Sequence, residues 1–479
     1  MSSVKKNYIY NVIYEILIIV IPLITSPYIS RVLGAEQVGV YTYCYSIVSY
    51  FVLFSRLGIV NHGSRSIAGA KTEEEKNSVF SNTLAIQFLL AIMMIILYVC
   101  YFTFFDLEYH TMSLIMLAYL VAAAFDVNWF FFGVEKFKIT VTRNIVIKII
   151  STVLLFLFVK KADDVWKYGL ILGLSQLIGQ IAVWPYLRKY VKFVKPKLKE
   201  MKLQFISIFI LFIPQIAVSL YKMMDKIMIG YYCTKDQLGF YEYASMIVNL
   251  PLGFITSLGT VMLPRISSLM KDGNNSKRTL EYTHYSLVFA IALSVAFAFG
   301  ISAIAPSFVP FYFGDEFVPT VELLIGLSST LVFIAWANVV RTQYLIPSKK
   351  DKEYIISLFS GAAVNIVINV ILIPEYQAWG AVIGTIAAEI VVCLVQTYMS
   401  RKYLPICKYL SETGGFLIIG IFMFCVVRVV ALIKVSVVIS ICLQISIGAL
   451  VYLLLTYIYV RFIIKLPLSK KIIWRKTKH

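Results

Sequence analysis

The stretch that organises this chain runs from Ile213 to Val248 and reads IPQIAVSLYKMMDKIMIGYYCTKDQLGFYEYASMIV. Its first half is a long apolar run that contains three ionisable residues, Lys222, Asp225 and Lys226. Such a run is typical of a membrane-spanning helix, in which ionisable side chains are costly and usually functional. Residues three and four positions apart share a helix face, so we expect these side chains broadly on one side.

The second half of this stretch has a counterpart near the start of the chain. The segment 238–243 (LGFYEY) matches 38–43 (VGVYTY) without a gap at its glycine and two tyrosines. Each copy follows an Ile-Pro pair, at Pro22 and Pro214 respectively. We interpret this as an internal repeat that divides the chain in two.

The composition indicates an integral membrane protein. Hydrophobic residues make up 60% of the 479 residues, and the mean hydropathy is +0.82. Charged residues make up only 14%, whereas soluble domains contain about 25%. The net charge of +19 would suit a nucleic-acid partner, but the basic residues lie in short loops between apolar runs, as the positive-inside rule describes. No nucleic-acid partner is therefore expected.

The sequence shows no metal or cofactor motif. The seven cysteines form no CxxC pair and the four histidines are scattered, so we expect neither a metal site nor disulfides, and no cofactor. No Walker A sequence, GxSxG, HExxH or DxD in an aqueous loop is present. These absences, with the short loops, disfavour an ATP-driven pump and an enzyme.

The predicted fold is an all-α integral membrane protein with about 14 transmembrane helices. The predicted spans are, within a few residues, about 8–32, 38–60, 79–105, 111–133, 140–160, 165–187, 204–232, 238–264, 281–305, 317–345, 353–374, 378–400, 412–434 and 437–464. Four prolines lie inside spans, where they commonly mark kinks: Pro22, Pro27, Pro214 and Pro251.

The repeat predicts two six-helix lobes and a C-terminal appendage. We expect an N-lobe over 1–190, a basic cytoplasmic linker over 191–203, a C-lobe over 204–402, and two further spans with a basic tail over 403–479. An even number of helices per copy makes both copies enter from one side, so a pseudo-two-fold axis along the membrane normal should relate the lobes, with a cavity between them.

Loop charges predict the orientation. Lysine and arginine crowd into one set of loops, including the linker, whereas the opposite loops hold acids such as Asp106 and Asp315. This bias places both termini in the cytoplasm. The linker, with its YVKFVKPKLKEMK segment, is expected to contact anionic membrane lipid.

Polar residues inside the spans are the candidate site. Tyr41, Tyr45, Ser49 and Arg56 form a polar stripe on the second span, and Arg56 either lines the cavity or extends to the interface. Arg31 lies at the outer end of the first span, where an interfacial anchor is the plain alternative.

Three acids inside spans are candidate coupling or structural charges: Asp126, Asp225 and Glu389. For Lys222, Asp225 and Lys226 the alternatives are a packing ion pair and a substrate site. An excess of Arg and Lys suits an anionic substrate group, and Tyr41 and Tyr241 could stack on sugars or act as interfacial anchors.

Several motifs, in order along the chain, resemble those of Wzx-type polysaccharide flippases. These belong to the multidrug/oligosaccharidyl-lipid/polysaccharide exporter superfamily. The motifs are RVLGAEQVGVY from Arg31, Leu57–Gly58–Ile59 with Gly63 to Arg65, Asp225 to Gly230 with Gly239 to Tyr241, Leu263–Pro264–Arg265, Gln343 to Pro347, Asn365, Asn369, and Trp379 to Glu389. The resemblance covers nearly the whole chain.

The resemblance implies a protein of the bacterial cell membrane that works by alternating access. It implies that undecaprenyl-pyrophosphate-linked oligosaccharide moves from the inner to the outer leaflet for capsule, O-antigen or exopolysaccharide synthesis. Glycosyltransferases and a polymerase of the same pathway would be partners. In this hypothesis Lys222, with Arg31 and Arg56, meets the pyrophosphate while Asp225 holds the lysines in place.

Two other classes stay open. One is an exporter of another cargo in the same superfamily, such as the peptidoglycan lipid precursor or a drug. A cationic drug would favour unpaired acids in the cavity, whereas this sequence supplies a cationic one. The other is a membrane polysaccharide polymerase, which a long extracytoplasmic loop with paired charges would favour.

Overall fold

The computed structural model describes the backbone of residues 3–105, 108–271 and 276–465. It describes the side chains of the same segments except residues 3–16, 18, 220–222, 271, 276 and 277. The described residues form helices and no strands, which confirms the predicted all-α class.

The helices follow one another with short connections. In chain order they are α1 (Ser3–Arg56), α2 (Ile59–Gly69), α3 (Glu73–Phe104), α4 (His110–Ala124), α5 (Asn128–Gly133), α6 (Phe137–Phe158), η1 (Ala162–Asp164), α7 (Val165–Ile181), α8 (Trp184–Leu187), α9 (Leu198–Tyr232), α10 (Lys235–Lys271), α11 (Ser276–Phe313), η2 (Asp315–Phe317), α12 (Thr320–Ser328), α13 (Thr330–Val340), η3 (Arg341–Leu345), α14 (Asp351–Tyr376), α15 (Ala378–Ser400), α16 (Ile406–Val430), α17 (Val437–Ile458) and η4 (Tyr459–Ile464).

Thirteen helical stretches in the described part of the chain are long and apolar enough to cross a membrane. The first, Ile19–Gly69, has 51 residues and overlaps the first two predicted spans, because α1 continues through Gly34, where the backbone is not helical. Gly34 has φ 75° and ψ 172°, a conformation that residues with a Cβ rarely adopt. Counting this stretch as two spans gives the number that the sequence predicts.

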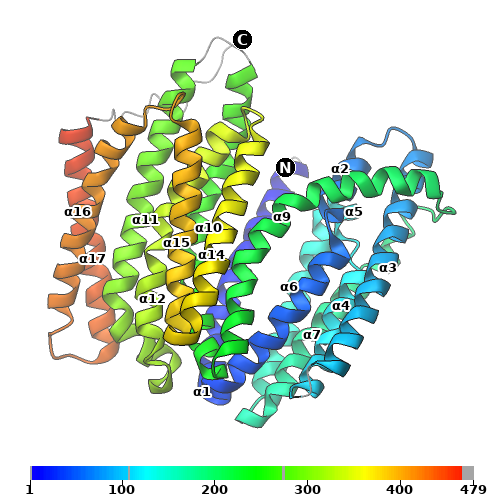
Figure 1. Ribbon diagram of the computed structural model, residues 1–479, viewed down its shortest axis with the longest axis horizontal. Coiled ribbons are helices and arrows are strands. Elements are labelled where there is room, and N and C mark those ends of the chain that lie inside the picture. The colour runs from blue at the N-terminus through cyan, green and yellow to red at the C-terminus, as the bar shows by residue number, and fades with distance from the viewer. Residues whose placement is uncertain (1–2, 106–107, 272–275, 466–479) are drawn as a thin grey trace. The chain divides into compact units, whose positions relative to one another are not determined.

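The prolines predicted inside spans lie inside helices. Pro22 and Pro27 are in α1, Pro214 is in α9, and Pro251 is in α10. Figure 1 shows α9 changing direction along its length. A proline removes one backbone hydrogen bond and crowds the preceding turn, so a bend in this proline-containing helix is expected.

The chain divides into two compact units. Unit 1 comprises residues 1–243 and 365–384, and unit 2 comprises 244–364 and 385–479. In unit 1, α9 packs against α1, α2 and α3. In unit 2, α16 and α17 pack along α11, as Figure 1 also shows. The predicted lobes, 1–190 and 204–402, were drawn from the sequence repeat and not from contacts. Their boundaries stay a prediction.

The two repeat copies contact each other reciprocally within unit 1. A Cβ added to Gly39 would lie 1.7 Å from the carbonyl oxygen of Lys235, and one added to Gly239 would lie 2.2 Å from that of Ala35. Residues that correspond in the repeat thus exchange roles, as expected for two copies around a local two-fold axis. Gly39 and Gly239 therefore lie close together in unit 1, and the relation between the lobes that the repeat predicts stays a prediction.

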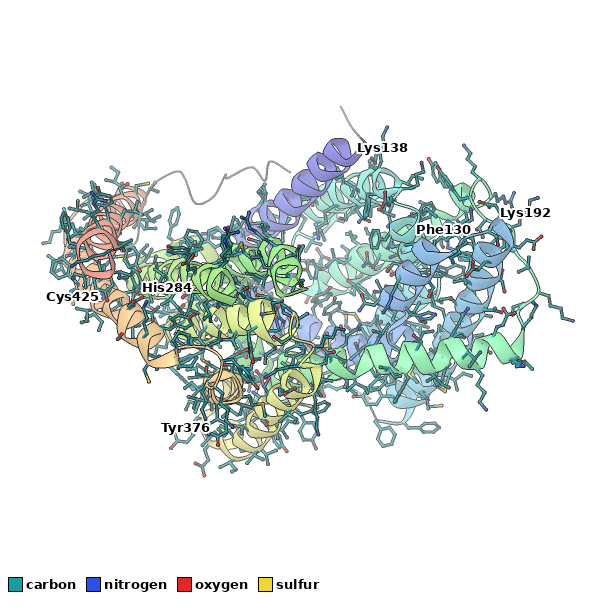
Figure 2. All side chains as sticks on the ribbon, turned by 90° about the horizontal axis from the view of Figure 1, so that it is seen from above. Phe130, Lys138, Lys192, His284, Tyr376 and Cys425 are labelled. Carbon is teal, nitrogen blue, oxygen red and sulfur yellow. The ribbon has the colours of Figure 1, made fainter. Side chains whose placement is uncertain are left out.

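The basic linker is fixed along α3 through its backbone. The amides of Lys192, Val194 and Lys197 donate to Asn77 Oδ1, Ser81 Oγ and Asn82 Oδ1 at 2.9, 3.0 and 2.9 Å. The lysine side chains of this segment are exposed, and Figure 2 shows Lys192 at the periphery of unit 1. The linker therefore presents its charges outward from a fixed backbone.

Candidate functional site

Asp225 on α9 is a buried carboxylate that helices distant in sequence hold in place. Its side chain is 2% exposed. The Tyr241 hydroxyl on α10 donates to Oδ2 at 2.9 Å, and Asn369 Nδ2 on α14 donates to Oδ1 at 2.6 Å. Burying a carboxylate is costly unless hydrogen bonds satisfy its oxygens, and these two donors contribute to that.

The amide groups beside Asp225 keep unused polar atoms. Asn369 Nδ2 also donates to Asn365 Oδ1 at 3.2 Å, yet Asn369 Oδ1 and Asn365 Nδ2 have no hydrogen-bond partner in the described part of the chain. A Cβ at Gly384 would lie 2.0 Å from Asn369 Oδ1, so only glycine fits there. Buried amide atoms without partners are rare, and a small polar ligand or water would satisfy them.

Lys226 pairs with Glu242 and not with Asp225. Lys226 Nζ on α9 lies 2.5 Å from Glu242 Oε2 on α10, and the two side chains are 23% and 29% exposed. Consecutive residues on a helix point about 100° apart, so Asp225 and Lys226 face different neighbours. In the described residues Glu242 is thus the acid that pairs with Lys226. The expectation that Asp225 holds the lysines in place stays a prediction. The Lys222 side chain lies outside the described residues.

Four tyrosines from three helices form an aromatic cluster in unit 1, hereafter the tyrosine cluster: Tyr41, Tyr45, Tyr119 and Tyr168. The hydroxyls of Tyr41 and Tyr119 are 2.9 Å apart. Tyr41 stacks on Tyr45 with ring centroids 5.8 Å apart and meets Tyr168 edge-on at 4.7 Å. Tyr45, which meets Tyr119 edge-on at 5.1 Å, is 40% exposed.

The tyrosine cluster lies close to the Lys226–Glu242 pair. Tyr168 interacts electrostatically with Glu242. Aromatic faces with hydroxyl groups beside a charged pair suit a ligand that has both apolar faces and hydroxyls, as sugars do.

Arg56 and Asp126 form an ion pair at the end of α1. Arg56 Nη2 lies 3.0 Å from Asp126 Oδ2, and the side chains are 29% and 9% exposed. Asp126 lies in the break between α4 and α5, where its Oδ1 accepts a hydrogen bond from the Asn128 amide at 3.0 Å. The pair thus joins the end of α1 to this break.

Gln87 satisfies three backbone carbonyls at the break between α4 and α5, and the Trp184 indole donates to a fourth, that of Phe125, at 2.9 Å. Gln87 Nε2 on α3 donates to the carbonyls of Ala123, Ala124 and Asp126 at 2.9 to 3.0 Å. Its Oε1 accepts from the Trp129 indole at 3.0 Å. A helix break leaves carbonyls without partners, which is costly in an apolar medium.

Arg143 on α6 completes this polar network. It donates to Asn128 Oδ1 at 2.6 Å, to Gln180 Oε1 at 3.2 Å and to the Gly179 carbonyl. Arg143, at the start of the predicted span 140–160, was not singled out by the sequence. A signal was present, since Asn128 and Gln180 are amides in apolar runs that require a donor or acceptor nearby.

Two further predicted residues are described, Arg31 and Glu389. Arg31 is exposed, and its Nη1 donates to the Pro27 carbonyl one turn earlier at 3.2 Å. Glu389 on α15 is buried in unit 2, 7% exposed. The structure thus joins Asp225 with Tyr241, and Arg56 with Asp126, and it adds Glu242, Asn369 and Tyr119, which the sequence did not assign to a site.

Comparison with known proteins identifies the family. Residues 4–270 match the family described as "Polysaccharide biosynthesis protein". A "Putative O-antigen transporter" of Shigella dysenteriae is 25% identical over 377 residues, which cover 78% of this chain and 94% of that protein. Another protein of that name, from Escherichia coli K12, is 25% identical over 404 residues, covering 83% and 96%.

A solved structure shares the fold. "Lipid II flippase MurJ, inward closed conformation" superposes with a TM-score of 0.76 at 17% identity and covers 95% of this chain and all of that one. The expected superfamily fold is therefore confirmed. The chain belongs to the polysaccharide biosynthesis protein family, as a multi-pass, all-α membrane protein with the fold of the multidrug/oligosaccharidyl-lipid/polysaccharide exporter superfamily.

Proposed function

We propose that the protein is a flippase that moves a lipid-linked oligosaccharide across the membrane. The observation that carries this proposal is the correspondence with two proteins named O-antigen transporters over 94% and 96% of their lengths. Its cargo is an undecaprenyl-pyrophosphate-linked repeat unit, used for capsule, O-antigen or exopolysaccharide. The flippase itself does no covalent chemistry, whereas glycosyltransferases and a polymerase of the pathway make and consume the cargo.

The proposed membrane arrangement follows from the charge bias of the loops. Both termini lie in the cytoplasm of a bacterial cell, and the lobes 1–190 and 204–402 alternate in access around the cargo. The appended spans of 403–479 lie outside the repeat. The reciprocal packing of Gly39 and Gly239 supports a repeat-based division.

The tyrosine cluster is proposed to bind the sugars. Its Tyr45 ring is 40% exposed while its neighbours hold it by stacking and edge contacts, so the ring is available yet fixed. Rigid aromatic rings bind with little loss of conformational entropy. Tyr241 is instead engaged with Asp225, so its part is to position that carboxylate.

Basic side chains are proposed to meet the pyrophosphate. Lys226 and Arg56 are partly exposed, and each is held by one acid, Glu242 and Asp126. Arg31 and Lys222 complete the proposed set. A pyrophosphate cannot cross hydrocarbon unpaired. A path lined with fixed cations lowers the free energy of moving it through the membrane.

Asp225 is proposed to couple transport to an ion. Of the three candidate acids it is the most buried, and neutral donors from α10 and α14 hold it. Beside it, Asn369 Oδ1 can accept from a water or bind a monovalent cation, and Asn365 Nδ2 can donate to a water. Asp126 is paired with Arg56 and suits a structural role.

Deletion of the gene in its native host tests the function. We expect loss of one surface polysaccharide and accumulation of its lipid-linked repeat units on the cytoplasmic side, restored by the wild-type gene. Accumulation of the peptidoglycan lipid precursor would show instead that this precursor is the cargo. Loss of polymer with normal amounts of outward-facing repeat units would show instead that the protein is a polysaccharide polymerase.

A further inference from the structure

Two cavities lie side by side in unit 2. The first has a volume of about 430 Å³ and is lined from Ala296 to Phe308 on α11, by Met423 on α16 and from Gln444 to Leu453 on α17. Its lining side chains are apolar except for those of Gln444 and Tyr452, and the Tyr452 hydroxyl is satisfied by the Ala292 carbonyl at 2.7 Å. The first cavity is thus an apolar chamber with one unsatisfied polar group.

That group is the Gln444 amide, which separates the two cavities. Its Nε2 donates to Ser440 Oγ at 2.9 Å and to Ser307 Oγ at 3.2 Å, and both serines line the second cavity, of about 410 Å³. Its Oε1 has no partner in the described part of the chain, although the side chain is fully buried. Because serine hydroxyls both donate and accept, the amide can also turn its N–H group toward a ligand.

The apolar chamber has the depth of one membrane leaflet. The twelve helical steps from Ala296 to Phe308 and the nine from Gln444 to Leu453 correspond to about 18 Å and about 14 Å. Half of the hydrocarbon core of a bilayer is about 15 Å. The polar cavity lies at the end where α11 stops and η2 begins, which is the outer end in the proposed topology.

The charges at the polar cavity suit a zwitterion. Asp315 lines this cavity, and the exposed Lys434 lies between two lining residues, Ile433 and Val435. A carboxylate in the lining and a lysine at the rim complement the ammonium and the phosphate of an amine-bearing head group. The same carboxylate would repel a pyrophosphate, which carries only negative charge.

We propose that these two cavities hold one outer-leaflet phospholipid with a primary-amine head group, of the phosphatidylethanolamine class. An acyl chain fills the apolar chamber, the Gln444 amide meets an ester carbonyl, and Asp315 accepts from the amine. The tail gains little in the chamber, because surrounding lipid is equally apolar, so the head group decides which lipid binds. This proposal stands independently of the cargo that the protein carries.

A lipid titration tests the head group. The detergent-purified, delipidated full chain is titrated with phosphatidylethanolamine, phosphatidylcholine and phosphatidylglycerol of identical acyl chains, and bound lipid is counted by native mass spectrometry. We expect one phosphatidylethanolamine per chain, bound about tenfold more tightly than the other two lipids, since only it offers charged N–H donors. Asp315→Asn should abolish the preference, and Glu316→Gln, one position away, should keep it.

A cavity-filling variant tests the location. Gly300 lines the apolar chamber, and a Cβ added there meets only Met423 Cε, at 3.9 Å, so Gly300→Leu fills the chamber without a backbone clash. We expect it to lose the bound lipid, whereas the control Gly414→Leu, where an added Cβ meets nothing within 4 Å, retains it.

Three results would overturn the proposal. Equal binding of the three lipids would show that the head group is not recognised. Retention of the lipid by Gly300→Leu would place it elsewhere. Displacement of phosphatidylethanolamine by equimolar undecaprenyl phosphate would assign the chamber to the carrier lipid.

Discussion

At the scale of the residue, two neighbouring charges on α9 have different partners. Asp225 and Lys226 are neighbours in the sequence, yet one is buried against Tyr241 and Asn369 and the other pairs with Glu242. The two groups therefore have different environments and are expected to respond differently to mutation.

Asp225→Asn should reduce transport by about tenfold or more at normal membrane level, because an amide cannot change charge while it keeps the size of the carboxylate. The measurement is surface polysaccharide in a deletion strain carrying the variant. Tyr241→Phe, which removes one hydrogen bond and keeps the charge, serves as control and should retain most transport. Normal polysaccharide from Asp225→Asn would limit Asp225 to a structural role.

Exchange of the Lys226–Glu242 pair separates packing from substrate binding. Lys226→Glu alone places two acids together and should lower the amount of protein in the membrane, because like charges near each other repel. Adding Glu242→Lys restores the pair and the protein level. If Lys226 meets the pyrophosphate, the double variant should still fail to transport. Full transport by the double variant would make the pair purely structural.

At the scale of the element, the contact between the two repeat copies depends on the absence of side chains. The second half of α1 and the start of α10 approach so closely that a Cβ at Gly39 or Gly239 would overlap a carbonyl oxygen of the other helix. Glycine permits such an approach because it has no Cβ. At other positions inside a helix glycine is less stable than alanine, so alanine would be favoured there.

Gly239→Ala should therefore force the two helices apart. Overpacking of this kind costs about 1–3 kcal/mol, and we expect a lower melting temperature in detergent together with reduced transport. The control is Gly253→Ala in the same helix, where an added Cβ meets nothing within 4 Å. A melting temperature equal to that of the control would mean that the helices separate at no cost.

At the scale of the whole molecule, the proposed topology is the feature that experiments can settle most directly. A cysteine at Lys197 should resist membrane-impermeant maleimide in intact cells, and one at Asp315 should react, because the loop charges place the linker inside and this turn outside. Both residues are exposed, so accessibility does not limit the reaction. Labelling at 197 in intact cells would reverse the orientation.

The sequence by itself determined the membrane class, the approximate spans, the prolines inside them and the repeat. Hydropathy acts on each segment separately, and proline and glycine act on their own turn, so these features need no knowledge of neighbours. The same local signals, in order, were enough to predict the superfamily fold that the comparisons confirm. Gly39 and Gly239 could be matched in the sequence, because equivalent residues of two repeat copies occupy equivalent places in the copies.

Only the tertiary structure decided which side chains meet. Glu242 was visible in the sequence, but its pairing with Lys226 depends on how α9 and α10 pack. Asn369 reaches Asp225 from a helix 144 residues away in the chain, and Tyr119 reaches Tyr41 across 78. In an apolar environment each polar group takes whichever partner the packing brings within hydrogen-bond distance, and helical periodicity shows the face of a residue but not the helix opposite it.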